Sequence, residues 1–441
     1  MKLFAIALTL VCVLLMFFVK REYKLAIMFM SSILLSLVTL PFKGITASIV
    51  LSLGFFLSEI PYIHGHWRRI RKSIILPFII LVTVAFLTAV IASPHLHNIS
   101  ALGFFGLSEL LAKQMALVYS FLALRRCRSL QPVLMVTFIS LLLMTLVGIV
   151  NYVMGYSFFV EEFIDDSYEF IRASRFRVQA TFNNPFNYGY MCVLLAILHL
   201  YGYMQKMEGR TMFAIAQACC LFGVFTCNCR TILFCYLVCA LVYAMAVIKD
   251  AKLKLGVLTA SLLLGVVFVM LVPMGRKMLL NILSIFDPTA VSDGSSLSMR
   301  MTQLATVIYY ISDSVLFGKG VHFFEEDLGW DNGSGLEVDT DLFGLEGIYL
   351  NLLLERGVVG FALFLATMLL IIIFIIKYRK LGRKLYALGL SVFVLYILFS
   401  FMTGELLSTT PAFYTLGYVI ANLTVRKQFL EQKIKYAKPE E

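Results

Sequence analysis

Three arginines of this 441-residue chain stand where membrane proteins rarely place a lone cation. Arg177 precedes a long apolar run, Arg230 lies in a connector of a few residues between two such runs, and Arg300 opens an amphipathic segment. A guanidinium matches phosphate oxygens with two parallel hydrogen bonds, and a helix N-terminus adds unpaired N–H groups that favour an anion. The three arginines are therefore candidate ligands for phosphate or pyrophosphate. The alternative is that each one snorkels or pairs with a loop carboxylate.

Groups that could accept a proton lie in the same part of the chain. The candidates are His322, the pair Asp339 and Asp341, and Glu346, which comes just before an apolar run. We expect Glu346 to be the best placed of them, because it returns the chain to the membrane near the level of a lipid pyrophosphate. The alternative for each carboxylate is that it is only solvated.

All of these acid–base candidates belong to one long polar interruption, residues 275–347, in a chain otherwise made of apolar runs. Acidic residues outnumber basic ones in it, although the formal net charge of the whole chain is +11. The segment that begins at Arg300 predicts a short amphipathic helix on the membrane surface. Its apolar residues recur at helical spacing: Met301, Leu304, Val307, Ile308 and Ile311.

Composition indicates the class of protein that positions these groups. Hydrophobic residues make up 60% of the chain and charged residues only 14%, and the apolar runs are long enough to cross a hydrocarbon core of about 30 Å. We predict an all-α polytopic membrane protein, a single domain over residues 1–441 with about 13 transmembrane helices and the loop 275–347 outside. The predicted spans are 3–19, 24–40, 45–63, 74–93, 104–124, 132–154, 185–204, 211–226, 231–248, 253–273, 348–376, 385–403 and 411–425.

The distribution of basic residues predicts the orientation. Five connectors are basic and fall on one side when the spans alternate: 20–24, 66–72, 125–128, 249–254 and 377–384. Lys and Arg are enriched in cytoplasmic loops, so these connectors and the tail after Arg426 are predicted to be cytoplasmic, with the N-terminus and the loop 275–347 outside. The same rule accounts for the basic excess, so nucleic acid is not an expected partner.

Other polar residues within the apolar runs give weaker signals. Glu59, His199 and Glu405 lie near the ends of predicted spans, where water is within reach, and they receive no functional role. Most of the nine cysteines fall inside apolar runs, where cysteine acts as a small hydrophobe. Cys227 and Cys229 are spaced too tightly for an ordinary disulfide and lack the further ligands of a zinc site. We therefore expect no disulfide framework and no metal.

Four short motifs follow one another around the long loop: residues 177–186, 228–231, 313–320 with Arg300 leading into it, and 346–360. Their order resembles the O-antigen ligase and polymerase family over roughly the C-terminal two thirds of the chain. Members of that family are membrane glycosyltransferases that act on undecaprenyl-pyrophosphate-linked glycans at the outer face of the bacterial inner membrane. The resemblance implies that Arg230 and Arg300 bind the pyrophosphate of the donor, with Arg177 a weaker candidate.

One departure from the family pattern favours one branch. Ligases typically have a His-Asn pair a few residues before the Tyr-Leu that opens the eleventh span, whereas this chain has Glu346-Gly347 there. We therefore expect a polymerase of O-antigen, capsule or exopolysaccharide repeats. In it a sugar hydroxyl would attack the anomeric carbon of the growing chain, Glu346 or His322 would take the proton, and no metal, nucleotide or other cofactor would be needed.

Two alternatives stay open at this stage. A ligase would move the finished glycan to lipid A core or protein, and only the missing histidine argues against it. A flippase for polyprenyl-linked glycans would show internal repeats and broken helices around a midplane site, and the sequence shows neither clearly. The expected partners are the lipid-linked donor and acceptor, membrane lipid, a chain-length regulator and a flippase.

Overall fold

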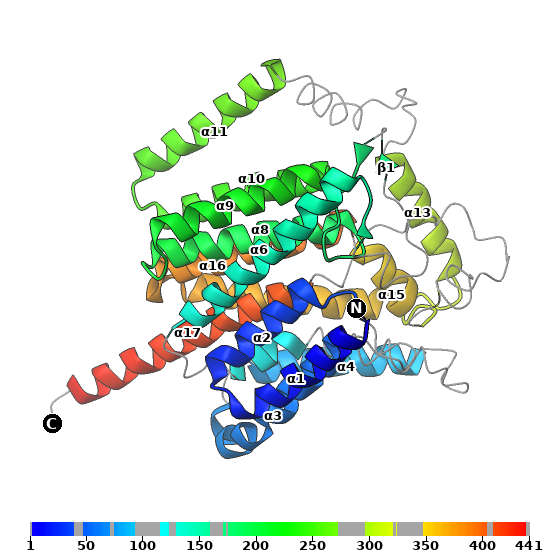
Figure 1. Ribbon diagram of the computed structural model, residues 1–441. Coiled ribbons are helices and arrows are strands. Elements are labelled where there is room, and N and C mark those ends of the chain that lie inside the picture. Colours follow the sequence, from blue (N-terminus) through cyan, green and yellow to red (C-terminus); the bar gives the residue numbers. More distant parts are fainter. Residues whose placement is uncertain are drawn as a thin grey trace.

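The computed structural model describes residues 2–38, 47–70, 75–92, 115–122, 129–158, 171–172, 175–271, 296–320, 323, 347–403 and 409–437. These residues are almost entirely helical (Figure 1), which confirms the predicted all-α membrane class. The helices are α1 (Lys2–Phe18), α2 (Arg21–Leu34), α3 (Ala47–Ile70), α4 (Ile75–Ala92), α6 (Gln131–Met154), α8 (Pro185–Met204), α9 (Arg210–Thr226), α10 (Arg230–Val247), α11 (Ala251–Leu271), α13 (Ser296–Tyr310), α15 (Ile348–Lys377), the 3-10 turn η4 (Arg379–Leu381), α16 (Arg383–Thr403) and α17 (Thr409–Ala437).

Each predicted span overlaps one of these helices or the helical residues 115–122. Four described helices are long and apolar enough to cross a membrane by length and composition, namely α6, α10, α15 and α16. The only strands among the described residues are β1 (Ile171–Arg172) and β2 (Arg175–Phe176), which pair antiparallel just before α8.

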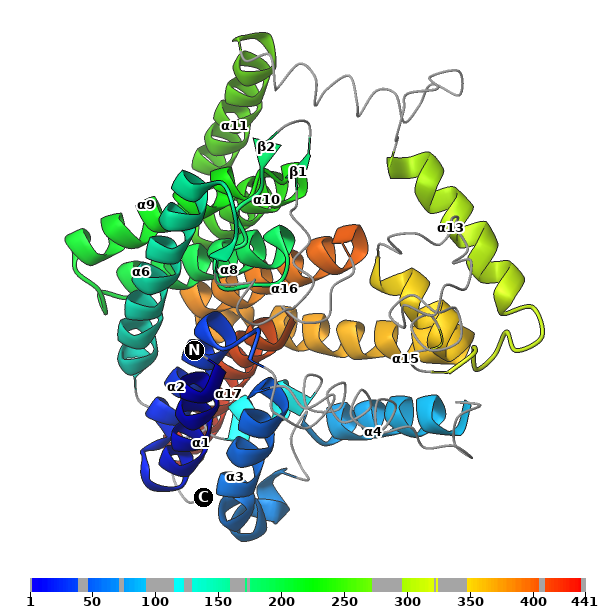
Figure 2. The same ribbon diagram turned by 45° about the vertical axis from the view of Figure 1, so that its right-hand side comes forward.

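The helix α8 is the centre of the bundle. Nearly all of its residues are buried, because α9, α10 and α16 pack around it. α16 also packs along α10, α15 and α17, so it joins the two halves of the bundle (Figure 2). The outer end of α16 therefore lies between the α8–α10 group on one side and the α13–α15 group on the other.

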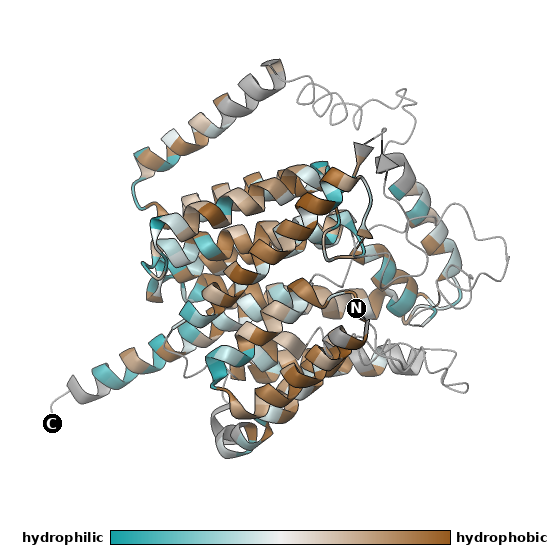
Figure 3. Cartoon of the chain, viewed as in Figure 1, coloured by the Kyte–Doolittle hydropathy of each residue, from teal (hydrophilic) through white to brown (hydrophobic). Residues whose placement is uncertain are grey.

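The polarity of the helix faces is that of a membrane protein. On α6, Ile139 and Leu146 face outward and are more than half exposed, whereas the polar residues Thr137, Ser140 and Asn151 are buried against the bundle. Figure 3 shows hydrophobic residues along the lengths of the helices and hydrophilic ones mainly toward their ends. Apolar side chains on the outside and polar ones inside suit lipid rather than water as the surrounding medium.

Basic residues close the helix ends at one end of the bundle. Arg383 donates to the carbonyl oxygens of Ala246 at 2.9 Å and Ile248 at 2.5 Å, at the end of α10. Lys384 donates to the Met204 carbonyl at the end of α8. Cations are favoured at helix C-termini, where carbonyl groups lack intrahelical donors. The basic residues predicted to set the orientation therefore also complete the ends of two central helices.

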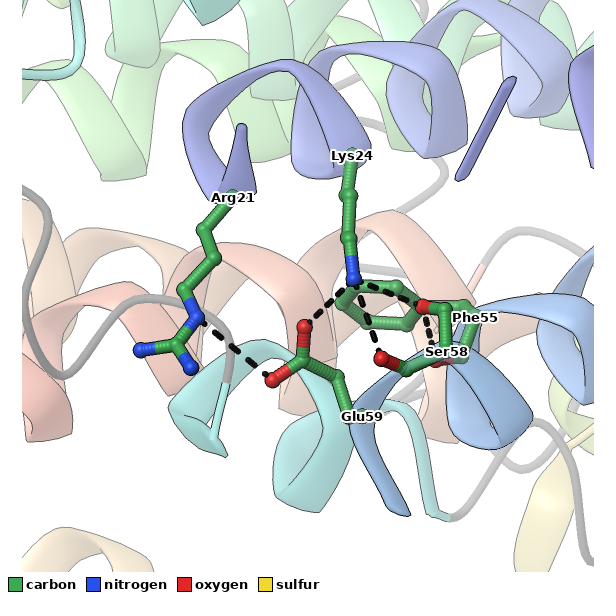
Figure 4. A network of polar contacts seen from close by, with 5 residues as sticks. All are labelled: Arg21, Lys24, Phe55, Ser58 and Glu59. Carbon is green, nitrogen blue, oxygen red and sulfur yellow. Dashed lines mark hydrogen bonds and ion pairs between the residues drawn. The ribbon is translucent and has the colours of Figure 1, made fainter. Parts of the chain in front are cut away.

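A buried ion pair joins α2 to α3 at the same end (Figure 4). The Lys24 ammonium donates to Glu59 Oε1 at 2.7 Å and to Ser58 Oγ at 2.9 Å, and Arg21 Nε lies 3.8 Å from Glu59 Oε2. Glu59 is only 1% exposed. The prediction that placed it within reach of water and gave it no role is wrong, because its charge is neutralised inside the protein.

Replacing Lys24 by alanine is expected to lower the free energy of unfolding by about 3 kcal/mol, because the Glu59 carboxylate would stay buried without its closest cation. We take the lower end of the usual range because Arg21 remains nearby. Thermal unfolding in detergent would measure the loss. The double variant Lys24→Leu/Glu59→Leu should recover much of it, and a single variant as stable as the parent protein would contradict this role.

Candidate active site at the other end of the bundle

Arg177, Arg230 and Arg300 all lie at the end of the bundle opposite to Arg383. The Val178 N–H donates to the Thr226 carbonyl at 3.1 Å, so the segment after Arg177 lies beside the turn that leads to Arg230. Arg300 Nη2 donates to the Met402 carbonyl at 2.5 Å, in the last turn of α16. Since α16 packs along both α8 and α10, the structure brings the three predicted anion ligands to one end.

Arg177 is held firmly in the loop between β2 and α8. Its side chain is 7% exposed, and its guanidinium carbon lies 5.6 Å from the ring centre of Phe186, a cation–π contact. The same loop is fixed to α2, because Thr181 Oγ1 donates to the Ile33 carbonyl at 2.5 Å. This burial fits the alternative in which Arg177 has a structural role, and it makes Arg177 the weakest of the three ligands.

Arg230 is the most accessible of the three. It is the first residue of α10, after a tight turn in which Asn228 has φ 50°, and its side chain is exposed. It makes no hydrogen bond or ion pair with any residue that the structure describes. The thiols of Cys227 and Cys229 donate to carbonyl oxygens within the turn, so these cysteines shape the hairpin. The hairpin thus presents a charged guanidinium beside the free N–H groups of a helix N-terminus.

Arg300 sits on the predicted amphipathic helix, which is α13. The helix is present, but its apolar residues face two ways. Val307 and Ile311 are buried against Leu350 and Leu354 at the start of α15, whereas Met301 and Ile308 are 60% and 55% exposed. α13 is therefore fixed to α15 by part of its apolar surface, and its position on the membrane surface stays a prediction.

The first turn of α15 meets the last turn of α16 next to Arg300. The rings of Tyr349 and Phe401 stack with their centres 5.7 Å apart, and a Cβ on Gly347 would lie 3.3 Å from the Phe401 carbonyl oxygen. Gly347 has φ 103°, a conformation that glycine adopts readily. The preceding residue, Glu346, lies outside the described residues, as do His322, Asp339 and Asp341, so their roles as proton acceptors stay predictions.

The structure shows that α15 is broken. Gly357 has φ 60° and ψ −163°, and the chain of residues 315–320 is hydrogen-bonded to both sides of the break. Figure 2 shows α15 beside α13. Four main-chain hydrogen bonds join the two segments: Lys319 N–H to the Leu354 carbonyl at 2.8 Å, Gly320 N–H to Glu355 at 2.9 Å, Val358 N–H to Val315 at 3.0 Å and Val359 N–H to Leu316 at 3.0 Å. Two motifs that look separate in the sequence therefore form one unit.

The break changes where this helix meets the membrane. The predicted span 348–376 would be about 43 Å long, well beyond a hydrocarbon core of about 30 Å. Residues 358–376, after the break, carry no charged side chain and cover about 29 Å. We therefore assign the crossing to residues 358–376, and residues 348–356 to the outer boundary beside α13. The unusual length and the charged pair Glu355-Arg356 are the signals that could have revealed this from the sequence.

An exposed ion pair flanks the segment in the break. Lys319 Nζ lies 2.6 Å from Asp313 Oδ2, and this hydrogen bond holds the pKa of Asp313 below its ordinary value of 3.8. A lowered carboxyl pKa means that the stabilisation is complete at neutral pH and is lost only as the pH falls below 3.8 toward the lowered value.

Because both partners of this pair are reached by solvent, Asp313→Asn is expected to change glycan product by less than about twofold at pH 7. Gel analysis of the glycan in cells that carry the variant would check this. A loss of most of the product would show instead that the Asp313 carboxylate takes part in the reaction.

Comparison with known families gives one match. Residues 215–365 match a family model described as O-antigen ligase. The matched segment contains most of α9, all of α10, α11 and α13, the segment in the break and the first half of α15, and therefore Arg230 and Arg300. No curated protein matches the chain. Among the described residues, no group of three or more His, Cys, Asp or Glu side chains is placed to hold a metal ion.

Proposed function

We propose that this chain, whose residues 215–365 match the O-antigen ligase family model, polymerises lipid-linked oligosaccharide repeats. The match supports a membrane glycan-processing protein of the glycosyl-transferring type. The finer proposal is that donor and acceptor are undecaprenyl-pyrophosphate-linked repeats of an O-antigen, capsule or exopolysaccharide. The reaction would take place at the outer face of a bacterial inner membrane.

The observation that carries the proposal is the position of Arg230 and Arg300 at the same end of the bundle. Arg230 is exposed at the start of α10, and Arg300 is anchored on the last turn of α16, which packs against α10. Two guanidinium groups on elements that are fixed to each other can stabilise a pyrophosphate without rearranging. This arrangement supports an anionic leaving group at that end.

The proposed reaction joins two lipid-linked glycans. A hydroxyl oxygen of one glycan forms a bond to the anomeric carbon of the other, and the bond from that carbon to the pyrophosphate oxygen breaks. The electron pair leaves with undecaprenyl pyrophosphate, whose growing charge Arg230 and Arg300 would stabilise, with Arg177 behind them. The hydroxyl proton would pass to Glu346 or His322.

Glu346-Gly347 supports a polymerase over a ligase, because a histidine-dependent ligase would need a histidine at that point of the chain. Broken helices such as α15 also occur in transporters, where the free backbone groups at the break bind ions or substrate. Here four of those groups are occupied by the chain itself. The break therefore supports a rigid enzyme site rather than a flippase.

The test compares a deletion strain with the same strain complemented by the parent gene, and it measures which lipid-linked glycans accumulate and on which leaflet. A polymerase predicts that the deletion accumulates single lipid-linked repeats on the outer leaflet. Retention of these repeats on the inner leaflet would indicate a flippase instead. Long lipid-linked chains that never reach their final acceptor would indicate a ligase, and either of these two results would refute the proposal.

A further inference from the structure

Arg356 is a buried cation that the proposed reaction has not yet used. It is the last residue before the break in α15, and its side chain is 3% exposed. Its Nε is fully buried without an acceptor, and the guanidinium makes no hydrogen bond or ion pair with any residue that the structure describes. Buried charges in proteins are normally paired, and none of the residues that the structure describes supplies a partner for this one.

Other polar side chains lie near Arg356. Tyr396 of α16 lies close enough to Arg356 and to Tyr190 of α8 to interact with both electrostatically, and its hydroxyl is hydrogen-bonded with Ser400. The Tyr190 ring stacks on Phe399 with its centre 4.4 Å away. The Tyr190 hydroxyl is also buried without a hydrogen-bond partner among the described residues. Arg356 of α15 and Tyr190 of α8 thus each bury a polar atom without a described partner, and Tyr396 of α16 lies close enough to interact with both.

Arg356 also lies at the level where the hydrocarbon core of the membrane is expected to begin. The uncharged crossing of α15 begins two residues later, so Arg356 stands at the boundary of the hydrocarbon. That is the depth at which the phosphate groups of a lipid lie. Arg300 stands farther out, beside the last turn of α16, whereas Tyr396 lies about 9 Å below Met402 along that helix.

A purely structural role of Arg356 does not explain why its buried Nε lacks a partner among the described residues. A cation in the last turn of a half-helix complements its dipole, but the Leu354 and Glu355 carbonyl groups at this end already accept hydrogen bonds from residues 319 and 320. Glu355 acts on the Arg356 charge, yet adjacent residues on a helix point to different faces. Neither feature pairs the buried Nε.

We propose that Arg356 binds a phosphate group of the polyprenyl-linked substrate at the hydrocarbon boundary, below Arg230 and Arg300. This inference rests on the proposed function and adds a binding residue to it. The guanidinium holds the phosphate nearest to the lipid chain, and the hydroxyl groups around Tyr396 complete the polar shell.

The test measures binding without catalysis. Purified protein in phosphatidylcholine nanodiscs is titrated with undecaprenyl pyrophosphate that carries no sugar, and bound lipid is counted by native mass spectrometry. We expect Arg356→Met to weaken binding at least tenfold at an unchanged melting temperature. Arg356→Lys keeps the charge but loses the bidentate guanidinium geometry, so it should weaken binding about threefold. If the methionine variant does not fold, the lysine variant provides the test.

Parallel titrations separate the sources of phosphate. Inorganic pyrophosphate should compete only weakly with undecaprenyl pyrophosphate. When the nanodiscs contain phosphatidylglycerol, the parent protein and the Arg356 variants should retain the same number of phosphatidylglycerol molecules. Equal affinity of the parent protein and both variants for undecaprenyl pyrophosphate would overturn the inference, and so would a loss of stability without a loss of affinity. If the Arg356 variants bind like the parent protein but Arg230→Ala weakens binding, only the role of Arg356 is refuted and the proposed function stands. A parent protein that does not bind undecaprenyl pyrophosphate refutes both the role of Arg356 and the proposed function.

Discussion

Gly357→Ala is expected to lower the free energy of unfolding by about 4 kcal/mol or more and to abolish glycan product. A Cβ at this position would lie 2.5 Å from the Leu316 carbonyl carbon and 2.6 Å from the Gly318 nitrogen, both of them main-chain atoms that cannot rotate away. The dihedral angles φ 60° and ψ −163° belong to a region used almost only by glycine. The variant would lose four main-chain hydrogen bonds of about 1 kcal/mol each.

The measurement is thermal unfolding in detergent together with the length of glycan in a complemented deletion strain. Gly256→Ala is the matched control, because a Cβ there would meet nothing within 4 Å and the residue lies in the regular helix α11. That control should be neutral or more stable by up to about 1 kcal/mol. A Gly357→Ala protein as stable and active as the parent would show that the break in α15 is not needed.

The second large effect is expected at the two arginines of the site. Arg230→Ala and Arg300→Ala should each lower the rate of glycan polymerisation roughly 100-fold, the usual cost of removing one preorganised group from a developing negative charge. Arg230→Lys should lose less, because an ammonium keeps the charge but not the bidentate geometry. The readout is long-chain polysaccharide in the deletion strain, at matched expression of each variant.

Arg210→Ala serves as the control for the arginine variants. Arg210 is also an exposed first residue of a helix, but it lies at the opposite end of the bundle, near the cations that close α8 and α10. Its replacement should leave the polysaccharide unchanged. Normal long-chain product from both Arg230→Ala and Arg300→Ala would remove these residues from the mechanism.

Much of the helical framework follows from hydropathy alone. Apolar runs of membrane length coincide with helices such as α6 and α16, because in lipid every backbone group must be bonded within its own segment. The amphipathic pattern after Arg300 likewise predicts α13. The same patterns cannot show which side of α13 meets α15, because Met301 and Val307 are equally apolar in the sequence, and only packing separates the exposed residue from the buried one.

The break in α15 lay beyond prediction for a different reason. Its stability comes from residues 315–320, which are far from Gly357 in the sequence, and main-chain hydrogen bonds leave little trace in residue types. Besides the length of the span and the pair Glu355-Arg356, the glycines Gly318 and Gly357 are a trace of this contact, since each would clash with the main chain of the other segment if it carried a Cβ. The burial of Glu59 was missed in the same way, because its partner Lys24 comes from another helix.

The most direct test of the proposed polymerase uses purified protein in nanodiscs with a single lipid-linked repeat and nothing else. The lipid-linked repeat is isolated from the deletion strain described above. The products are separated by size and analysed for the group at their reducing end. We expect a ladder of chains that still carry undecaprenyl pyrophosphate, with one undecaprenyl pyrophosphate released for each bond formed. No elongation under these conditions, with transfer appearing only when a lipid A core or protein acceptor is added, would contradict it.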